Sequence, residues 1–211
     1  MKKLILVFAS AVMFFAISAS AQSVNAGFGL GGSYPKAPDS IGFDSEVFVD
    51  VGLNKFFAVG LESGFGWIKK SSGKDIDFGS KAPPITSNDS INYYSIPLLL
   101  TATVYFPVGD YESALKPYIS GGAGYSWTTF SASGVFNQKN TTFHGFTWQA
   151  LIGIDYNLGS DANNMSVFLE GGYRGTMLER KVNPYGTLEL DMSGAFVKAG
   201  VSFPIVAANS Y

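Results

Sequence analysis

The sequence of 211 residues contains no cysteine and a single histidine, His144. The absence of cysteine excludes disulfides, a thiolate metal site, a cysteine nucleophile and lipid attachment through an N-terminal cysteine. With one histidine, every Ser-His-Asp mechanism and every histidine-based metal site must use His144. A chain of this size without disulfides must therefore be held together by hydrogen bonds and packing.

Charged residues are also scarce. They make up 14% of the chain, against 15% for aromatic residues, whereas about 25% charged residues is usual for a soluble domain. This deficit indicates an environment other than water. The formal net charge is −2 and the basic residues form no patch, so nucleic acid is not an expected partner.

The N-terminus has the pattern of a secretory signal peptide. Lys2 and Lys3 precede an apolar run over residues 4–17, and Ala-Ser-Ala follows at residues 19–21. The run has 14 positions, fewer than the about 20 that a membrane-spanning helix needs. We therefore expect residues 1–21 to be a signal peptide and residues 22–211 to form one domain.

After residue 22, apolar or aromatic residues recur at every second position, which predicts strands with two chemically different faces. Between residues 57 and 67, for example, the apolar positions are Phe57, Val59, Leu61, Phe65 and Trp67. Eight such segments occur, at residues 24–33, 41–53, 56–68, 91–106, 117–130, 143–158, 165–176 and 190–203. Eight is the smallest strand number usual for a closed transmembrane barrel.

The second face distinguishes a membrane barrel from a soluble sandwich or lipocalin. It consists mainly of Gly, Ser, Thr and Asn, whereas a soluble sheet would carry Lys, Glu and Arg toward water. Small polar residues suit a narrow enclosed lumen. The fold prediction is therefore all-β, an eight-stranded antiparallel up-and-down transmembrane β-barrel. Trp67, Trp127 and Trp148 fall on the apolar face and predict an aromatic girdle at a membrane interface.

The connectors alternate in length. Those at residues 54–55, 107–116 and 159–164 form the shorter set, and the longest connector covers residues 69–90. With both ends of the chain on the periplasmic side, the shorter set becomes the periplasmic turns and the longer set the extracellular loops. The first connector, residues 34–40, is short for an extracellular loop.

Two strands resemble a known family. Residues 93–100, Tyr-Tyr-Ser-Ile-Pro-Leu-Leu-Leu, and residues 117–124, Pro-Tyr-Ile-Ser-Gly-Gly-Ala-Gly, are similar to segments of small outer-membrane β-barrel proteins, the porin-family or OmpA/OmpX-like barrels. The resemblance implies a bacterial outer-membrane location, assembly by the barrel-assembly machinery, no cofactor and no catalytic residue to transfer. Pro97 lacks the N–H that a barrel strand requires, so we expect a bulge or local irregularity there.

Seven charged residues lie on the inward face: Glu46, Asp50, Glu62, Asp155, Glu170, Arg174 and Lys198. Asp155 is closer to the inner end, and the other six are expected at similar depth. An unpaired buried charge costs several kcal/mol, so we predict a polar network of salt bridges around Arg174 and Lys198. The alternative is an ion path, and the surplus of acids would make it weakly selective for cations.

His144 lies at the expected outer rim, between Phe143 and Gly145, with no serine two residues later and no acid close in sequence. Ser131 or Asp89 could approach it from neighbouring loops. We interpret His144 as an interfacial residue and expect no enzyme activity and no metal site.

The loops carry the remaining charges. Lys69, Lys70, Lys74 and Lys81 in the third connector, with Arg180 and Lys181 at the start of the seventh, could contact lipopolysaccharide phosphates. Asp75 and Asp77 are too few for calcium. We predict a monomeric outer-membrane protein with a structural or surface-interaction role through its extracellular loops and contacts with membrane lipid. The alternatives are a narrow pore and a lipid-modifying enzyme.

Overall fold

The computed structural model describes residues 23–70, 75–76, 85–86, 91–106, 108, 114–131, 141–159, 165–182 and 186–206. All regular structure within these ranges is β-strand, and they contain no helix long and apolar enough to cross a membrane. The expected signal peptide, residues 1–21, lies outside the described residues.

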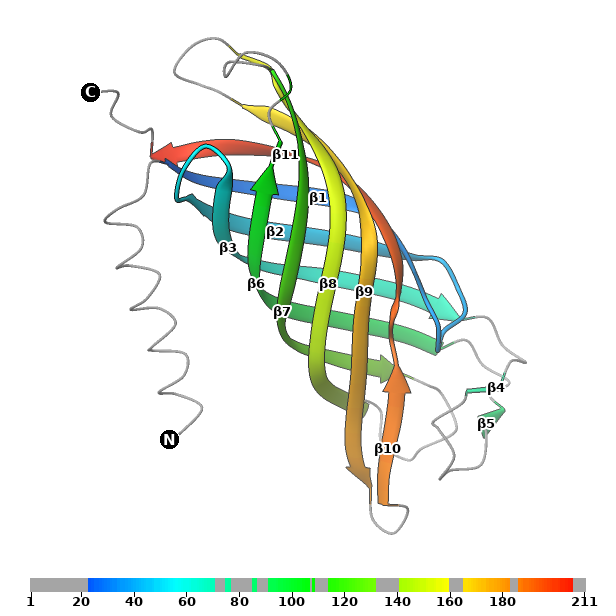
Figure 1. Cartoon of the computed structure of the whole chain (residues 1–211). Helices are drawn as coiled ribbons and strands as arrows, with labels where there is room; N and C mark the ends of the chain where they lie inside the picture. The colour runs from blue at the N-terminus through cyan, green and yellow to red at the C-terminus, as the bar shows by residue number, and fades with distance from the viewer. Residues whose placement is uncertain are drawn as a thin grey trace, which may run out of the picture.

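Eight strands form a closed antiparallel ring (Figure 1). In order around the ring they are β1 (Ser23–Pro35), β2 (Gly42–Gly52), β3 (Phe57–Lys70), β6 (Ile91–Tyr105), β7 (Leu115–Ser131), β8 (Thr141–Asn157), β9 (Ser166–Val182) and β11 (Gly194–Val206). Pairing of β1 with β11 closes the ring, with Val24 opposite Val206. The closed ring leaves no free sheet edge and confirms the predicted eight-stranded barrel.

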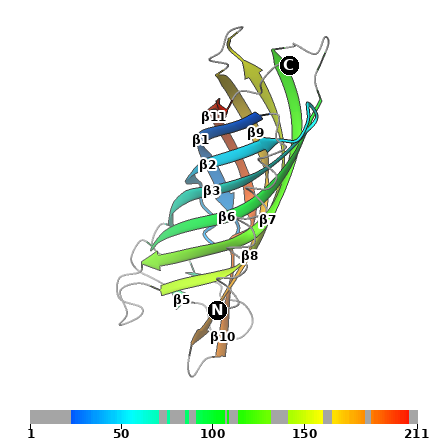
Figure 2. The ribbon, with the colours of Figure 1, turned by 90° about the vertical axis from the view of Figure 1, so that its left-hand side faces the viewer.

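The two ends of the barrel differ. At one end lie Ser23, Val206 and the short turn over residues 53–56; we call it the terminus end. At the other, the loop end, β9 and β10 (Gly186–Asp191) form a hairpin that projects beyond the ring, as Figures 1 and 2 show. Two short paired strands, β4 (Asp75–Ile76) and β5 (Ile85–Thr86), also belong to the loop end.

The β9–β10 hairpin corrects the sequence prediction for the end of the chain. The predicted strand at residues 190–203 is divided at Met192 and Ser193 into β10 and β11, both of which pair with β9. The expected seventh connector is therefore largely strand, and β9 extends to Val182. The physical reason is burial: Leu178, Leu188 and Leu190 all pack in an apolar cluster at the loop end.

The short first connector packs against this division. The backbone N–H groups of Lys36 and Ala37 donate to the carbonyls of Ser193 (2.9 Å) and Asp191 (3.0 Å). The connector thereby supplies partners to carbonyl groups where the last strand is interrupted.

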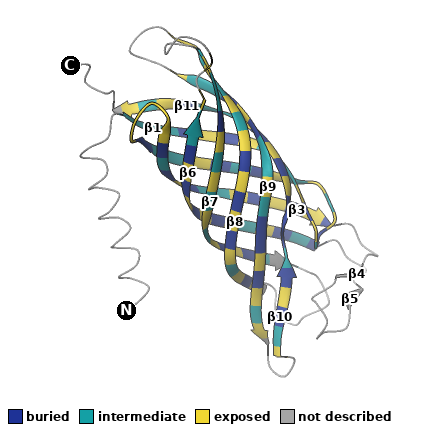
Figure 3. Cartoon of the chain, in the orientation of Figure 1, coloured by how far each residue is buried: buried dark blue, intermediate teal, exposed yellow. Residues whose placement is uncertain are grey.

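The strands have two faces, which appear as alternating bands of burial in Figure 3. On β8, for example, Ile152 is 69% exposed on the outer face whereas its neighbour Leu151 is 6% exposed on the inner face. Phe146 and Leu100 are likewise outward and exposed. Apolar side chains on the outside and polar ones inside reverse the arrangement of a water-soluble sheet.

Pro97 produces the expected irregularity without a bulge. The β3–β6 ladder is interrupted between Ser63, which pairs with Leu98, and Gly66, which pairs with Ser95. The register resumes unchanged, because the number of residues skipped is the same on both strands. The Ser63 hydroxyl donates to the Pro97 carbonyl (2.9 Å).

Inward glycines make room for large lumen side chains, and this can be tested at Gly153. A Cβ at this position would collide with the ring of Tyr118. We expect Gly153→Ala to lower the free energy of unfolding by about 1–3 kcal/mol through overpacking. Gly121→Ala is the matched control, because its Cβ would be 3.8 Å from the nearest atom of a neighbouring strand, the Gln149 carbonyl oxygen. Denaturant unfolding in lipid vesicles measures both; equal stability of the two variants would refute the packing argument.

Candidate functional site

The first part of the lumen site is built around Arg174 of β9. Its guanidinium forms ion pairs with Asp44 of β2 (3.2 Å) and Glu62 of β3 (3.5 Å). It also donates to the Gln149 side-chain oxygen from Nε (3.2 Å) and from Nη2 (3.1 Å). The Gln149 amide nitrogen in turn donates to Glu62. Arg174 thus joins strands on opposite sides of the ring.

The second part is built around Lys198 of β11, which is 1% exposed. Its ammonium contacts three carboxylates, those of Glu46, Glu62 (3.5 Å) and Glu170 (3.3 Å). The Tyr118 hydroxyl donates to Glu170 (2.9 Å). Glu62 contacts both cations, so the two parts form one set of interactions.

Phe196 lies beside both cations. Its ring centre is 5.2 Å from the Arg174 guanidinium carbon and 4.6 Å from the Lys198 ammonium. Phe196 and Lys198 are two residues apart on β11, so both point inward. We call the combined set the lumen network: Asp44, Glu46, Glu62, Tyr118, Gln149, Glu170, Arg174, Phe196 and Lys198.

Five of the seven inward charges named from the sequence meet in this network: Glu46, Glu62, Glu170, Arg174 and Lys198. The other two, Asp50 and Asp155, lie on the wall of a cavity on the terminus side. Asp44 is a further member that was not predicted from the sequence, although it shares the inward parity of Glu46 on the same strand.

One cavity lies on each side of the lumen network. The terminus-side cavity has a volume of about 460 Å³, and its wall includes Asp50, Tyr105, Tyr118, Asp155 and Phe168. The loop-side cavity has a volume of about 40 Å³, and Asp44, Arg174, Thr176 and Phe196 line it. Arg174 and Phe196 therefore stand beside the smaller space, whereas Glu46, Glu62 and Glu170 face the larger one.

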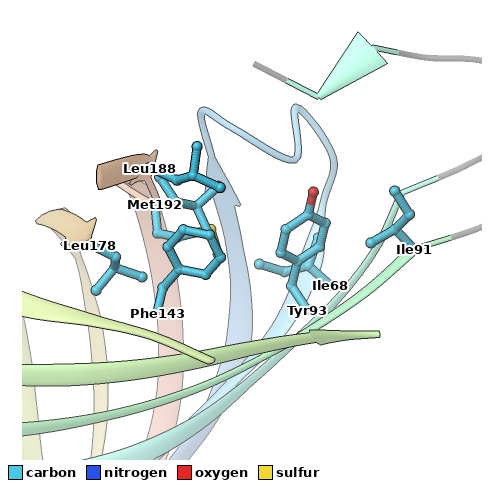
Figure 4. Packing of buried hydrophobic residues seen from close by; sticks show 8 residues of the cluster. Ile68, Ile91, Tyr93, Phe143, Leu178, Leu188 and Met192 are labelled. Atoms are coloured by element: carbon cyan, nitrogen blue, oxygen red, sulfur yellow. The ribbon is translucent and has the colours of Figure 1, made fainter. Parts of the chain in front are cut away.

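An apolar cluster occupies the loop end beyond the smaller cavity (Figure 4). Its buried members are Ile68, Ile91, Tyr93, Phe143, Leu178, Leu188, Leu190 and Met192. They come from β3, β6, β8, β9 and β10 and from the junction that follows β10. The lumen therefore contains a charged layer and, nearer the loops, an apolar layer.

The three tryptophans lie on the outer face. Trp67, Trp127 and Trp148 are 44%, 41% and 44% exposed. The Trp67 indole N–H donates to Asn92 (3.2 Å). Outward aromatic side chains with a polar contact are the residue type expected at a membrane interface.

His144 is exposed on the outer face of β8. Its Nδ1 lies 2.6 Å from the Tyr125 hydroxyl, and the two rings stack with centres 5.8 Å apart. Ser131 ends β7, and Asp89 lies outside the described residues. In the described part of the chain, no group of three or more His, Asp or Glu residues is arranged to hold a metal ion.

The basic residues that were predicted to lie in the loops occupy different environments. Lys69 is exposed at the end of β3, whereas Lys70 is buried and donates to the Ala37 carbonyl (3.2 Å). Arg180 and Lys181 lie on β9, which corrects their expected loop position. Lys74, Lys81 and Asp77 lie outside the described residues.

Removing the buried ammonium tests the energetic role of the lumen network. We expect Lys198→Met to lower the free energy of unfolding by about 3–5 kcal/mol, because three buried carboxylates lose their shared cation. Lys36→Met is the control: the exposed Lys36 forms an ion pair with Asp191 (3.6 Å), and such surface pairs contribute little. Denaturant midpoints in lipid vesicles measure both. Equal midpoints would contradict a stabilising role for the lumen pairs.

Comparisons with known proteins give similar solved structures and a family. Among solved structures, the chain is similar to Neisserial surface protein A, with 17% identity, coverage of 85% of this chain and 94% of that one, and a TM-score of 0.49. It is also similar to outer membrane protein OprG from Pseudomonas aeruginosa, with 15% identity, coverage of 89% and 98%, and a TM-score of 0.49. A search of curated proteins gives no match. The model of the outer membrane protein beta-barrel domain family matches residues 7–203, so the chain belongs to that family of outer-membrane proteins.

Proposed function

We propose that this outer-membrane barrel has a structural or surface-interaction role and that its lumen is closed. The observation that carries the proposal is the pair of layers in the lumen: the lumen network and, beyond it, the apolar cluster. With the passage blocked at two levels, the surface at the loop end becomes the part available for specific contacts.

Opening the lumen to an ion would have a high cost in free energy. An ion that crosses the lumen must displace Arg174 or Lys198 from carboxylates that are themselves buried. Removing one partner of a buried pair costs about 3–5 kcal/mol. The apolar side chains nearer the loops offer an ion no replacement for its water shell.

The difference between the two ends of the barrel supports an orientation in the membrane. We propose that the terminus end faces the periplasm and the loop end faces the outside, because outer-membrane barrels place short turns in the periplasm and longer loops outside. The apolar outer face then contacts lipid, with Trp67, Trp127 and Trp148 as its aromatic girdle. Exposed cations such as Lys69 and Lys181 would face lipopolysaccharide phosphates. Assembly would use the barrel-assembly machinery, and the protein would function as a monomer without enzyme activity.

Ion conductance discriminates between this proposal and a narrow pore weakly selective for cations. Purified protein in planar bilayers is expected to show no steady open level, because the lumen network and the apolar cluster remain in place. The informative contrary result is a reproducible open level in the wild type that Arg174→Gln or Glu62→Gln abolishes. Exposed Glu189→Gln, at the loop end, is the control with the same change of charge as Glu62→Gln.

A further inference from the structure

The terminus-side cavity has the properties of a small-molecule site. Its volume of about 460 Å³ lies within the roughly 300–1,000 Å³ of typical ligand pockets. The lumen network bounds it on one side, and residues at the terminus end such as Ser23, Asn54 and Asn157 line its other side. A ligand would therefore enter from the terminus end and stop at the network.

The charges around this cavity do not balance. The lumen network and the cavity wall together contain six carboxylates: Asp44, Glu46, Asp50, Glu62, Asp155 and Glu170. The same region contains four cations, Lys55, Lys116, Arg174 and Lys198. By formal charge the acids therefore exceed the cations by two in this confined space, and a ligand with two positive charges would balance them.

Asp50 differs from the carboxylates of the lumen network in its contacts. Within the described residues it makes no hydrogen bond and no ion pair, and the charged groups acting on it are the acids Glu62 and Glu170. Gly60 on the paired strand leaves room for this side chain, because a Cβ there would collide with the Asp50 carboxylate. Asp50 lines the cavity, so a cation in that space can reach it.

The rest of the wall indicates what kind of cation fits. Phe48, Ala58, Leu151 and Phe168 contribute apolar surface. Tyr105 and Tyr118 add two aromatic rings with centres 5.7 Å apart, and aromatic faces attract ammonium groups. A bare metal ion is less suitable, because the described residues contain no metal-ligating group of three.

We propose that the terminus-side cavity binds a linear alkyl diamine, with its ammonium groups at Asp50 and Asp155 and its methylene chain against the apolar wall. This ligand supplies the two missing positive charges and has an apolar middle. Binding from the terminus end requires no opening of the lumen network.

Calorimetric titration of 1,4-diaminobutane into the full mature protein, folded in detergent micelles at low salt, tests the site. We expect saturable binding at one site in the wild type. Asp50→Asn should weaken it by about tenfold or more, equivalent to about 1.4 kcal/mol. Glu189→Gln, an equal change of charge outside the cavity, should leave it unchanged. Asp155→Asn provides a second variant on another strand, and heat-modifiable gel mobility verifies that each variant is folded.

Two further ligands define the chemistry. 1,4-Butanediol, which has the same length without charge, should give no binding, and 1-aminobutane should bind more weakly than the diamine. The proposal is overturned if the wild type shows no saturable binding or if both aspartate variants bind as the wild type does. Equal-stoichiometry displacement of the diamine by calcium chloride would also overturn it, in favour of a site for inorganic cations.

Discussion

The pairing of buried charges inside a barrel of fixed width is the constraint on which the rest of this structure depends. Lys198 is 1% exposed inside the ring, so it cannot be hydrated as it would be in water. Its contact with Glu46 joins residues 152 positions apart, and the contact of Arg174 with Asp44 joins residues 130 apart. The charges can therefore be satisfied only when the distant strands that carry them have closed into the ring.

The outer face must instead be compatible with lipid. In lipid each backbone polar group needs a partner within the protein, and a closed ladder provides it. Side chains such as Leu100 and Ile152 are exposed on that face, which would be unfavourable in water and suits a bilayer. The strand period of two meets both requirements, because adjacent residues face the lipid and the lumen in turn.

The sequence was sufficient to predict the features that depend on which face of a strand a residue occupies. It was insufficient for features that depend on a residue's depth in the barrel or on contacts with distant parts of the chain. Parity identified the barrel and the inward positions of Glu62 and Lys198. It did not give depth along a tilted strand, so Asp50, expected beside the network, lines the cavity instead. The β9–β10 hairpin was missed because its strand character depends on burial of Leu178 and Leu188 against residues far away in the chain. Asp44 had a usable signal, the inward parity of its strand.

Closure of the lumen is the central claim, and the cysteine-free sequence allows a direct test by thiol labelling. Ser120 lines the terminus-side cavity, and Thr176 lines the loop-side cavity between the lumen network and the apolar cluster. Each is replaced singly by cysteine, and the folded protein is treated with a small charged methanethiosulfonate that can approach from both ends. Closure predicts rapid labelling of Ser120→Cys and protection of Thr176→Cys until the protein is unfolded. Labelling of both positions at similar rates in the folded protein would contradict a closed lumen.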